Sequence, residues 1–184
     1  MKSLTLVLLP VAVTLAACAA QPMMMTPMVD NTTLPEAVRA PAGTMQKMLA
    51  VGSGELTYEC REKKDMAGAF EWGVVGPVAT LKTKSGEVVG KYYAGPTWES
   101  VDGSKITGKQ LAVAPNGPGN IPMQLVKADP AVPSSNGVGA MQGISHIQRL
   151  QTVGGVAPAT ACAAANKGER KSVAYQADYV FYGM

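Results

Sequence analysis

Hydrophobic and polar positions along most of this chain change over short intervals, as they do in β-strands. From position 49 onward, short apolar runs are separated by turn-forming glycine, proline, asparagine and aspartate residues. The clearest run is Val173–Tyr182, in which Val173, Tyr175, Ala177 and Tyr179 alternate with their neighbours and share one face. This alternation predicts a core strand at the end of the chain.

Six further segments fit strands of the same kind. They are residues 54–60, 72–81, 87–94, 105–113, 121–126 and 144–152. The last segment also has a partly helical spacing, but glycines bound it on both sides and favour a strand. Residues 129–143 are predicted to form a long exposed loop. The pattern therefore predicts a mostly β domain, folded as a single β-sandwich or barrel-like domain with long loops.

The first residues have the pattern of an export signal. Lys2 precedes an apolar run over 4–14, which is shorter than the roughly 20 residues that a membrane-spanning helix needs. The run ends in Leu15-Ala16-Ala17-Cys18, which resembles the lipobox of bacterial lipoproteins. We therefore predict a signal peptide over 1–17 and lipidation at Cys18. The alternative is ordinary cleavage nearby, with Cys18 unmodified.

Lipid at Cys18 would make the membrane a partner, because each buried methylene contributes about 0.8 kcal/mol. Ala19 and Ala20 follow the cysteine. By analogy with lipoprotein sorting in Gram-negative bacteria, the lack of an aspartate there favours the outer membrane, facing the periplasm or the cell surface. Residues 18–48 are rich in proline and methionine, and are predicted to be a lipid-anchored flexible tether before a β-rich domain at 49–184.

Charge and cysteine content limit the partners and the compartment. The formal net charge is +3, and loss of Lys2 with the signal peptide leaves +2. A balance this weak gives no electrostatic support for binding nucleic acid. Assigning one of the three cysteines to lipid leaves Cys60 and Cys162, an even pair in an oxidising compartment. We predict a disulfide between them; the alternative is two buried free thiols.

A series of motifs in the domain resembles one known family. The motifs are Gly52-x-Gly54-x-x-x-Tyr58-x-Cys60, Ala94-Gly95-Pro96-Thr97-Trp98-Glu99, Asp102-Gly103-Ser104, Ile147–Pro158, Cys162 and Tyr175–Tyr182. In this order they resemble the domain of unknown function 3455, found in secreted bacterial and fungal proteins. The resemblance implies a secreted, mostly β domain and no particular activity. The family carries a histidine–tyrosine pair where this chain has Tyr92-Tyr93, which puts any role of that histidine in doubt here.

Candidate chemistry in this sequence is sparse. The single histidine, His146, has no partners in a pattern typical of a zinc site or a catalytic triad. We therefore predict no catalytic residue, no metal and no cofactor. Four methionines within 23–28 are soft ligands that suit Cu(I), but the same residues fit a flexible leader without a ligand.

The segment most suggestive of ligand binding surrounds Trp98. This residue, with Glu99, Asp102 and the nearby Tyr93, could hold a glycan or another small molecule, because aromatic rings stack on sugars and carboxylates accept hydroxyl protons. The alternative is that Trp98 packs in the core and Asp102 caps a turn. The sequence therefore leaves both a binding role and a structural role open for this segment.

Arg149 is a charged residue in an otherwise apolar segment. Buried charges are normally paired, so it either forms an ion pair with Asp178 or Glu99 or holds an anionic ligand. Our leading hypothesis is a non-enzymatic cell-envelope lipoprotein with a binding or structural module. The alternative is a glycan-acting hydrolase that uses Glu99 and Asp102 with Trp98, since paired carboxylates can cleave glycosides.

Overall fold

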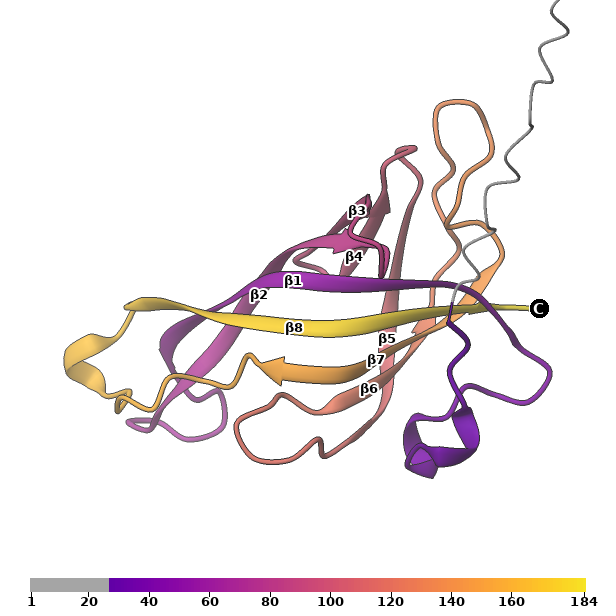
Figure 1. Ribbon diagram of the computed structural model, residues 1–184. Coiled ribbons are helices and arrows are strands. Elements are labelled where there is room, and N and C mark those ends of the chain that lie inside the picture. Colours follow the sequence, from indigo (N-terminus) through magenta and orange to yellow (C-terminus); the bar gives the residue numbers. More distant parts are fainter. Residues whose placement is uncertain (1–26) are drawn as a thin grey trace, which may run out of the picture.

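Eight antiparallel strands follow one another around a closed barrel, and the last strand returns to pair with the first (Figure 1). The computed structural model describes residues 27–184. The strands are β1 (Met45–Glu62), β2 (Phe70–Lys82), β3 (Val88–Tyr93), β4 (Thr97–Ser100), β5 (Lys105–Ala114), β6 (Met123–Ala128), β7 (Ile144–Gly154) and β8 (Arg170–Gly183). Three 3-10 helices are η1 (Asn31–Thr33), η2 (Glu36–Val38) and η3 (Ala164–Asn166). The predicted mostly β, barrel-like domain is confirmed.

Each of the seven predicted strand segments overlaps a strand of the barrel, although residues 87 and 94 lie just outside β3 and residues 121–122 precede β6. The prediction missed β4, because a strand of four residues offers only two positions on each face and shows no readable period. In β7 the pairing register shifts between Leu150 and Val153, where Gln151 has a φ of 47°. A second register shift, between Ile144 and His146, and the packing of Leu150 in an outer cluster explain why the hydrophobic spacing of the segment is not a clean alternation.

The barrel domain begins earlier than the sequence indicated. Residues 27–48 were expected to belong to a flexible tether, but β1 begins at Met45, and η1 and η2 pack on the outside of the barrel. The signal peptide 1–17, Cys18 and Met23–Met25 lie outside the described residues. Among residues 27–184, no helix is both long and apolar enough to cross a membrane.

Large aromatic side chains fill the barrel interior. Trp98, Tyr92, Tyr179 and Phe181 belong to one buried cluster that also receives residues from the other strands. The strand β1 presents small residues to this cluster: a Cβ added to Gly52 would lie 2.6 Å from the Tyr179 ring. The interior is therefore packed by pairing bulky residues with small ones across the barrel.

The N-terminal segment forms a second layer outside the sheet. Figure 1 shows this segment, in indigo, at the end of the barrel where the C-terminus lies. Val38 is completely buried against Ala114 and Leu125 on the outer face of β5 and β6. Gln148, also completely buried, donates its amide to the Val38 carbonyl at 2.6 Å and to Asn31 Oδ1 at 2.8 Å. Polar and apolar contacts together attach this segment to the barrel.

Candidate functional site

Trp98 lies inside the barrel rather than at a binding surface. Only 1% of the residue is exposed. Its ring stacks on Tyr92 with the centroids 4.8 Å apart and meets Tyr179 and Phe181 edge-on. The indole nitrogen has no hydrogen-bond partner among residues 27–184. Both ring faces are enclosed by protein, so this arrangement leaves none on which a sugar could stack.

Glu99 points to the outer face of the barrel, where its neighbours neutralise its charge. The Tyr93 hydroxyl donates to Glu99 Oε2 at 2.7 Å, and the amines of Lys91 and Lys105 lie at 3.2 and 3.3 Å. The Tyr93 hydrogen bond, with help from the two lysines, lowers the pKa of Glu99. Tyr93 and Glu99, both predicted site residues, do meet, but they meet in a satisfied surface cluster.

Asp102 holds a turn together. Its Oδ1 accepts hydrogen bonds from the Ser104 backbone at 2.8 Å and the Ser104 hydroxyl at 2.6 Å, and its Oδ2 accepts one from the Ala140 backbone at 2.7 Å. These bonds, led by the Ser104 hydroxyl, lower the pKa of Asp102 to about 2. Asp102 also lines an open hollow formed with residues 134–140, which Glu99 does not line. Each carboxylate is therefore held by its own neighbours, and the two do not line this hollow together as the paired carboxylates of a glycosidase would.

Arg149 points into the barrel. It pairs in register with Gln124 on β6 and with Tyr179 on β8. Tyr179 belongs to the interior cluster, and so does Val126, two residues beyond Gln124 on the same strand face. Because paired residues on adjacent strands point to the same side of a sheet, Arg149 and Gln124 both face inward. A charged side chain thus lies among apolar interior positions.

The expected carboxylate partners of Arg149 are occupied elsewhere. Asp178 and Glu99 both form ion pairs with lysines. The Nε and Nη2 atoms of Arg149 donate instead to the carbonyl oxygen of Pro122, at 3.2 and 2.9 Å. In the part of the chain that the structure describes, no carboxylate forms an ion pair with this guanidinium.

The charge of Arg149 acts on a group of buried tyrosines. Burial raises the pKa of Tyr58, Tyr92, Tyr175 and Tyr179, while Arg149 acts in the opposite direction on all four. The hydroxyls of Tyr175 and Tyr179 lie 3.2 Å apart. All four phenols stay protonated at neutral pH, so they offer no negative charge to balance the guanidinium.

One side of the barrel is open beside Arg149. The short strand β4 pairs only with Lys105–Thr107, so residues 108–114 of β5 have a ladder partner on one side alone, which is β6. Residues 70–77 of β2 pair only with β1. The inward-facing Gln110 and Val113 are consequently exposed, Val113 by 44%. The inward-facing polar side chains next to Arg149 are therefore accessible to solvent on this side of the barrel.

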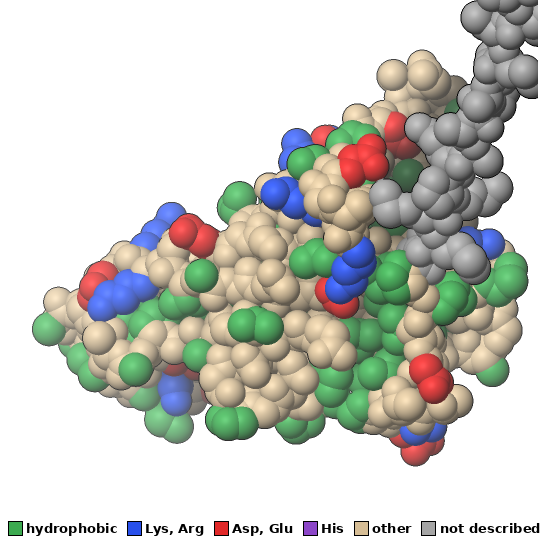
Figure 2. Space-filling model, in the orientation of Figure 1, with side chains coloured by type: hydrophobic (Ala, Val, Ile, Leu, Met, Phe, Trp, Pro, Cys, Tyr) green, Lys and Arg blue, Asp and Glu red, His purple; other side chains and the backbone are tan. Residues whose placement is uncertain are grey.

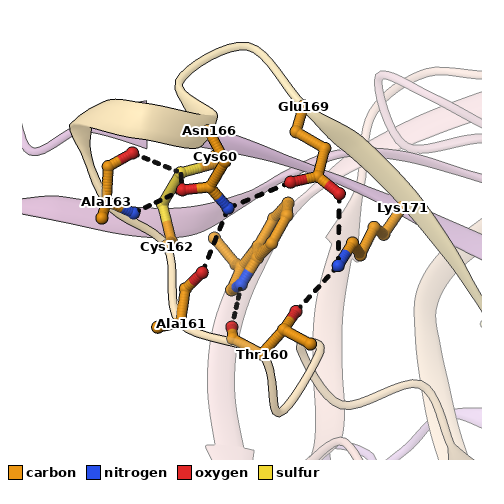
Figure 3. Close-up of a disulfide and its surroundings, with 9 residues drawn as sticks. Cys60, Thr160, Ala161, Cys162, Ala163, Asn166, Glu169 and Lys171 are labelled. Atoms are coloured by element: carbon orange, nitrogen blue, oxygen red, sulfur yellow. Dashed lines mark hydrogen bonds and ion pairs between the residues drawn. A yellow bond between two sulfur atoms is a disulfide. The ribbon is translucent and has the colours of Figure 1, made fainter.

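The disulfide lies among the loops at the far end of β1. Cys60 and Cys162 are bonded, with Cα atoms 5.5 Å apart, which confirms the predicted pair. Figure 3 shows Asn166 beside it, donating to Glu169 at 3.0 Å and to the Ala161 carbonyl at 3.1 Å. The covalent link and these bonds attach the loop between β7 and β8 to the first strand.

The disulfide joins two cysteines of the motif series, and the motif residues from Gly52 to Tyr182 lie within one barrel. A family model described as "Protein of unknown function (DUF3455)" matches residues 41–183. The chain belongs to the DUF3455 family. No curated protein and no solved structure matches it. The family boundary at 41 agrees with a barrel that begins at Met45.

Sequence reasoning missed three residues of the open side in this DUF3455 domain. Gln110, Val113 and Gln124 face the interior beside Arg149. The sequence could have predicted an inward-facing Gln124, since this residue lies two positions from the apolar Val126 and therefore on the same strand face. The signal for Val113 was hidden, because a register shift between Gln110 and Ala112 reverses the face of the residues after it.

The single histidine and the acidic residues within residues 27–184 do not form a cluster of reactive groups. His146 is buried with its Nδ1 3.0 Å from the Ser145 hydroxyl, and burial together with Lys127 lowers its pKa. Within residues 27–184, no three His, Cys, Asp or Glu side chains are grouped as a metal site would require. On the face drawn in Figure 2, acidic and basic side chains lie interspersed.

Proposed function

We propose that this protein is an exported, non-enzymatic binding module, held at the bacterial cell envelope by lipid on Cys18. The observation that carries the binding role is the open side of the barrel, where inward-facing Gln110 and Val113 are exposed beside Arg149, which has no ion-pair partner within residues 27–184. Small-molecule sites typically combine an apolar surface with a few placed polar groups, and this side of the barrel offers both.

Export is supported by two independent features. The Cys60–Cys162 disulfide is of a type that persists in oxidising compartments outside the cytosol. The Leu15–Cys18 segment resembles a lipobox, and Ala19 follows it. The outer membrane, facing the periplasm or the surface, is the location that this combination favours.

Metabolic labelling tests the anchor. Radiolabelled palmitate should enter the wild-type protein and be absent from Cys18→Ser, because the acyl chains require the thiol. Cys162→Ser provides the matched control, since it removes a cysteine that the disulfide uses, and it should label like the wild type. Equal labelling of Cys18→Ser and the wild type would remove the lipid anchor from the proposal.

A binding screen tests the module. The full-length protein, purified in detergent, is screened against small organic acids, amines, neutral sugars and their uncharged analogues by ligand-observed NMR. Specific binding of at least one compound class is expected, and competition within that class should displace it. A screen in which no class binds above the detergent background would contradict the binding role.

A further inference from the structure

The open side of the barrel has a defined set of hydrogen-bonding groups. Gln124 donates its amide nitrogen to Gln110 Oε1 at 2.7 Å, which holds the two side chains together across β5 and β6. The amide nitrogen of Gln110 has no bond to another side chain within residues 27–184, and it remains a donor. Arg149 pairs with Gln124 on β6, and Gln124 bonds to Gln110 on β5, so the three residues follow one another across the inner face of β5–β7. The guanidinium lies at the Pro122 side of Gln124, whereas Gln110 pairs with Val126 on the other side.

The guanidinium has donors to spare. An arginine carries five N–H groups in a planar fork, and here Nε and one N–H of Nη2 are used by the carbonyl of Pro122. The Pro122 contact fixes the orientation of the fork without neutralising its charge. A half-buried cation that keeps its charge and several donors is suited to an anionic ligand.

The surroundings select a carboxylate among anions. The patch offers one positive charge, while its other polar groups are neutral amides and protonated phenols. A monovalent, planar carboxylate matches one arginine fork in charge and shape, whereas a phosphate dianion would keep an unbalanced charge. The exposed inward face of Val113 supplies apolar contact for the body of the ligand.

We propose that Arg149 binds the carboxylate of a small organic acid at the open side of the barrel. This inference rests on the proposed binding function and names its ligand class. Gln124 and Gln110, bonded to each other on the same inner face, offer neutral amide groups to the rest of the acid. Val113 contacts the hydrocarbon part of the acid and favours acids with an apolar body over formate or acetate.

Benzoate and its neutral isostere benzamide test the inference in the full-length protein. Benzoate should bind and benzamide should not, since only benzoate carries the charge. Arg149→Gln should weaken benzoate binding by roughly tenfold or more, which is the effect expected for loss of a charge-assisted pair. Arg149→Lys keeps the charge but loses the planar guanidinium, so its benzoate affinity should lie between those of the wild type and Arg149→Gln.

Arg61→Gln is the matched control, because it makes the same charge change at an arginine on the exposed side of β1. It should bind benzoate like the wild type. If Arg61→Gln and Arg149→Gln weakened benzoate binding equally, the loss would follow from net charge alone, and the proposed site at Arg149 would be wrong. Inorganic phosphate binding as tightly as benzoate would overturn the carboxylate class.

The outcomes separate this inference from the binding function itself. If another compound binds the wild type while benzoate does not, or benzoate binds Arg149→Gln unchanged, the carboxylate site is wrong and the binding function stands. If nothing binds the wild type, both fail. If Arg149→Gln melts at a lower temperature than the wild type, the Arg149→Lys variant provides the test instead. Benzoate affinity equal to that of the wild type in Arg149→Lys would rule out recognition by the planar guanidinium.

Discussion

The side of the sheet that a residue faces decides its role in this barrel, even for residues that are adjacent in sequence. Trp98 and Glu99 are adjacent in sequence, yet Trp98 packs in the interior and Glu99 pairs with lysines outside. Arg149 faces inward and forms no ion pair with the part of the chain that the structure describes, whereas Asp178 pairs with Lys84. The direction of each side chain thus decides between packing, ion pairing and availability for a ligand.

Replacing Trp98 tests its role in packing. Trp98→Ala removes a completely enclosed indole that contacts three aromatic rings, so we expect a loss of about 3–5 kcal/mol in the free energy of unfolding. Urea titration followed by circular dichroism measures it. Trp72→Ala, at a half-buried position near the disulfide, should cost less. Equal losses would contradict the interior role of Trp98.

Acid titration tests the Asp102 turn. The folded-state pKa of Asp102 is about 2, below the ordinary 3.8, so its stabilising effect is present above pH 3.8 and is lost as the pH falls toward 2. Asp102→Ala should therefore be less stable than the wild type at neutral pH, and the difference should shrink as the pH falls from 3.8 through about 2. Asp65→Ala, in the β1–β2 turn, is the control variant. A difference that stays constant across this range would refute the linkage.

At the scale of elements, two short pieces of chain shape the barrel. The four residues of β4 leave β5 without a ladder partner beyond Thr107, which opens the side where Arg149 lies. The η1–η2 segment covers the outer faces of β5–β8 and buries Val38 and Gln148. One element therefore exposes an interior surface, while the other covers an exterior one.

A charge introduced at Val38 tests the outer layer. Val38→Asp places a carboxylate in a completely buried apolar position, and we expect a loss of at least about 2 kcal/mol in unfolding free energy. Ala37→Asp makes the same kind of change at the exposed neighbour and should be nearly neutral. Thermal denaturation of both variants measures the contrast. Similar melting temperatures would mean that the segment does not pack on the barrel.

At the scale of the whole molecule, a covalent link joins distant parts of the chain. Cys60 and Cys162 are separated by 102 residues, so the disulfide spans six of the eight strands between the end of β1 and the loop before β8. The link restricts the unfolded chain over most of its length. Its contribution to stability should therefore be large by the chain-entropy argument.

Reduction of the disulfide tests this contribution. The double variant Cys60→Ser/Cys162→Ser should lose about 4 kcal/mol in unfolding free energy relative to the oxidised wild type. Dithiothreitol should lower the unfolding free energy of the wild type toward that of the variant and leave that of the variant unchanged. If dithiothreitol changed the unfolding free energy of both proteins by the same amount, its effect would not come from the Cys60–Cys162 disulfide.

Several features of the protein were readable in its sequence because they depend on local pattern. Period-two alternation in 173–182 and short runs between turn residues predicted the strands, since a strand exposes alternate side chains whatever its neighbours are. The cysteine count predicted the pair 60 and 162 through parity. The prediction of a flexible tether was wrong for residues 27–44. Their proline-rich sequence does not prevent Val38 from packing against Ala114 and Leu125 on the outer face of the barrel.

The open side and its chemistry required the three-dimensional arrangement. Which face of a strand lies inside depends on register, and a shift of one residue, as in β5, sends Val113 inward where alternation alone would send it outward. The position of Trp98 inside, and the assignment of Asp178 and Glu99 to lysines rather than Arg149, likewise arise from pairing between strands. Sequence pattern specifies the strands, while the closure of the barrel specifies which residues meet.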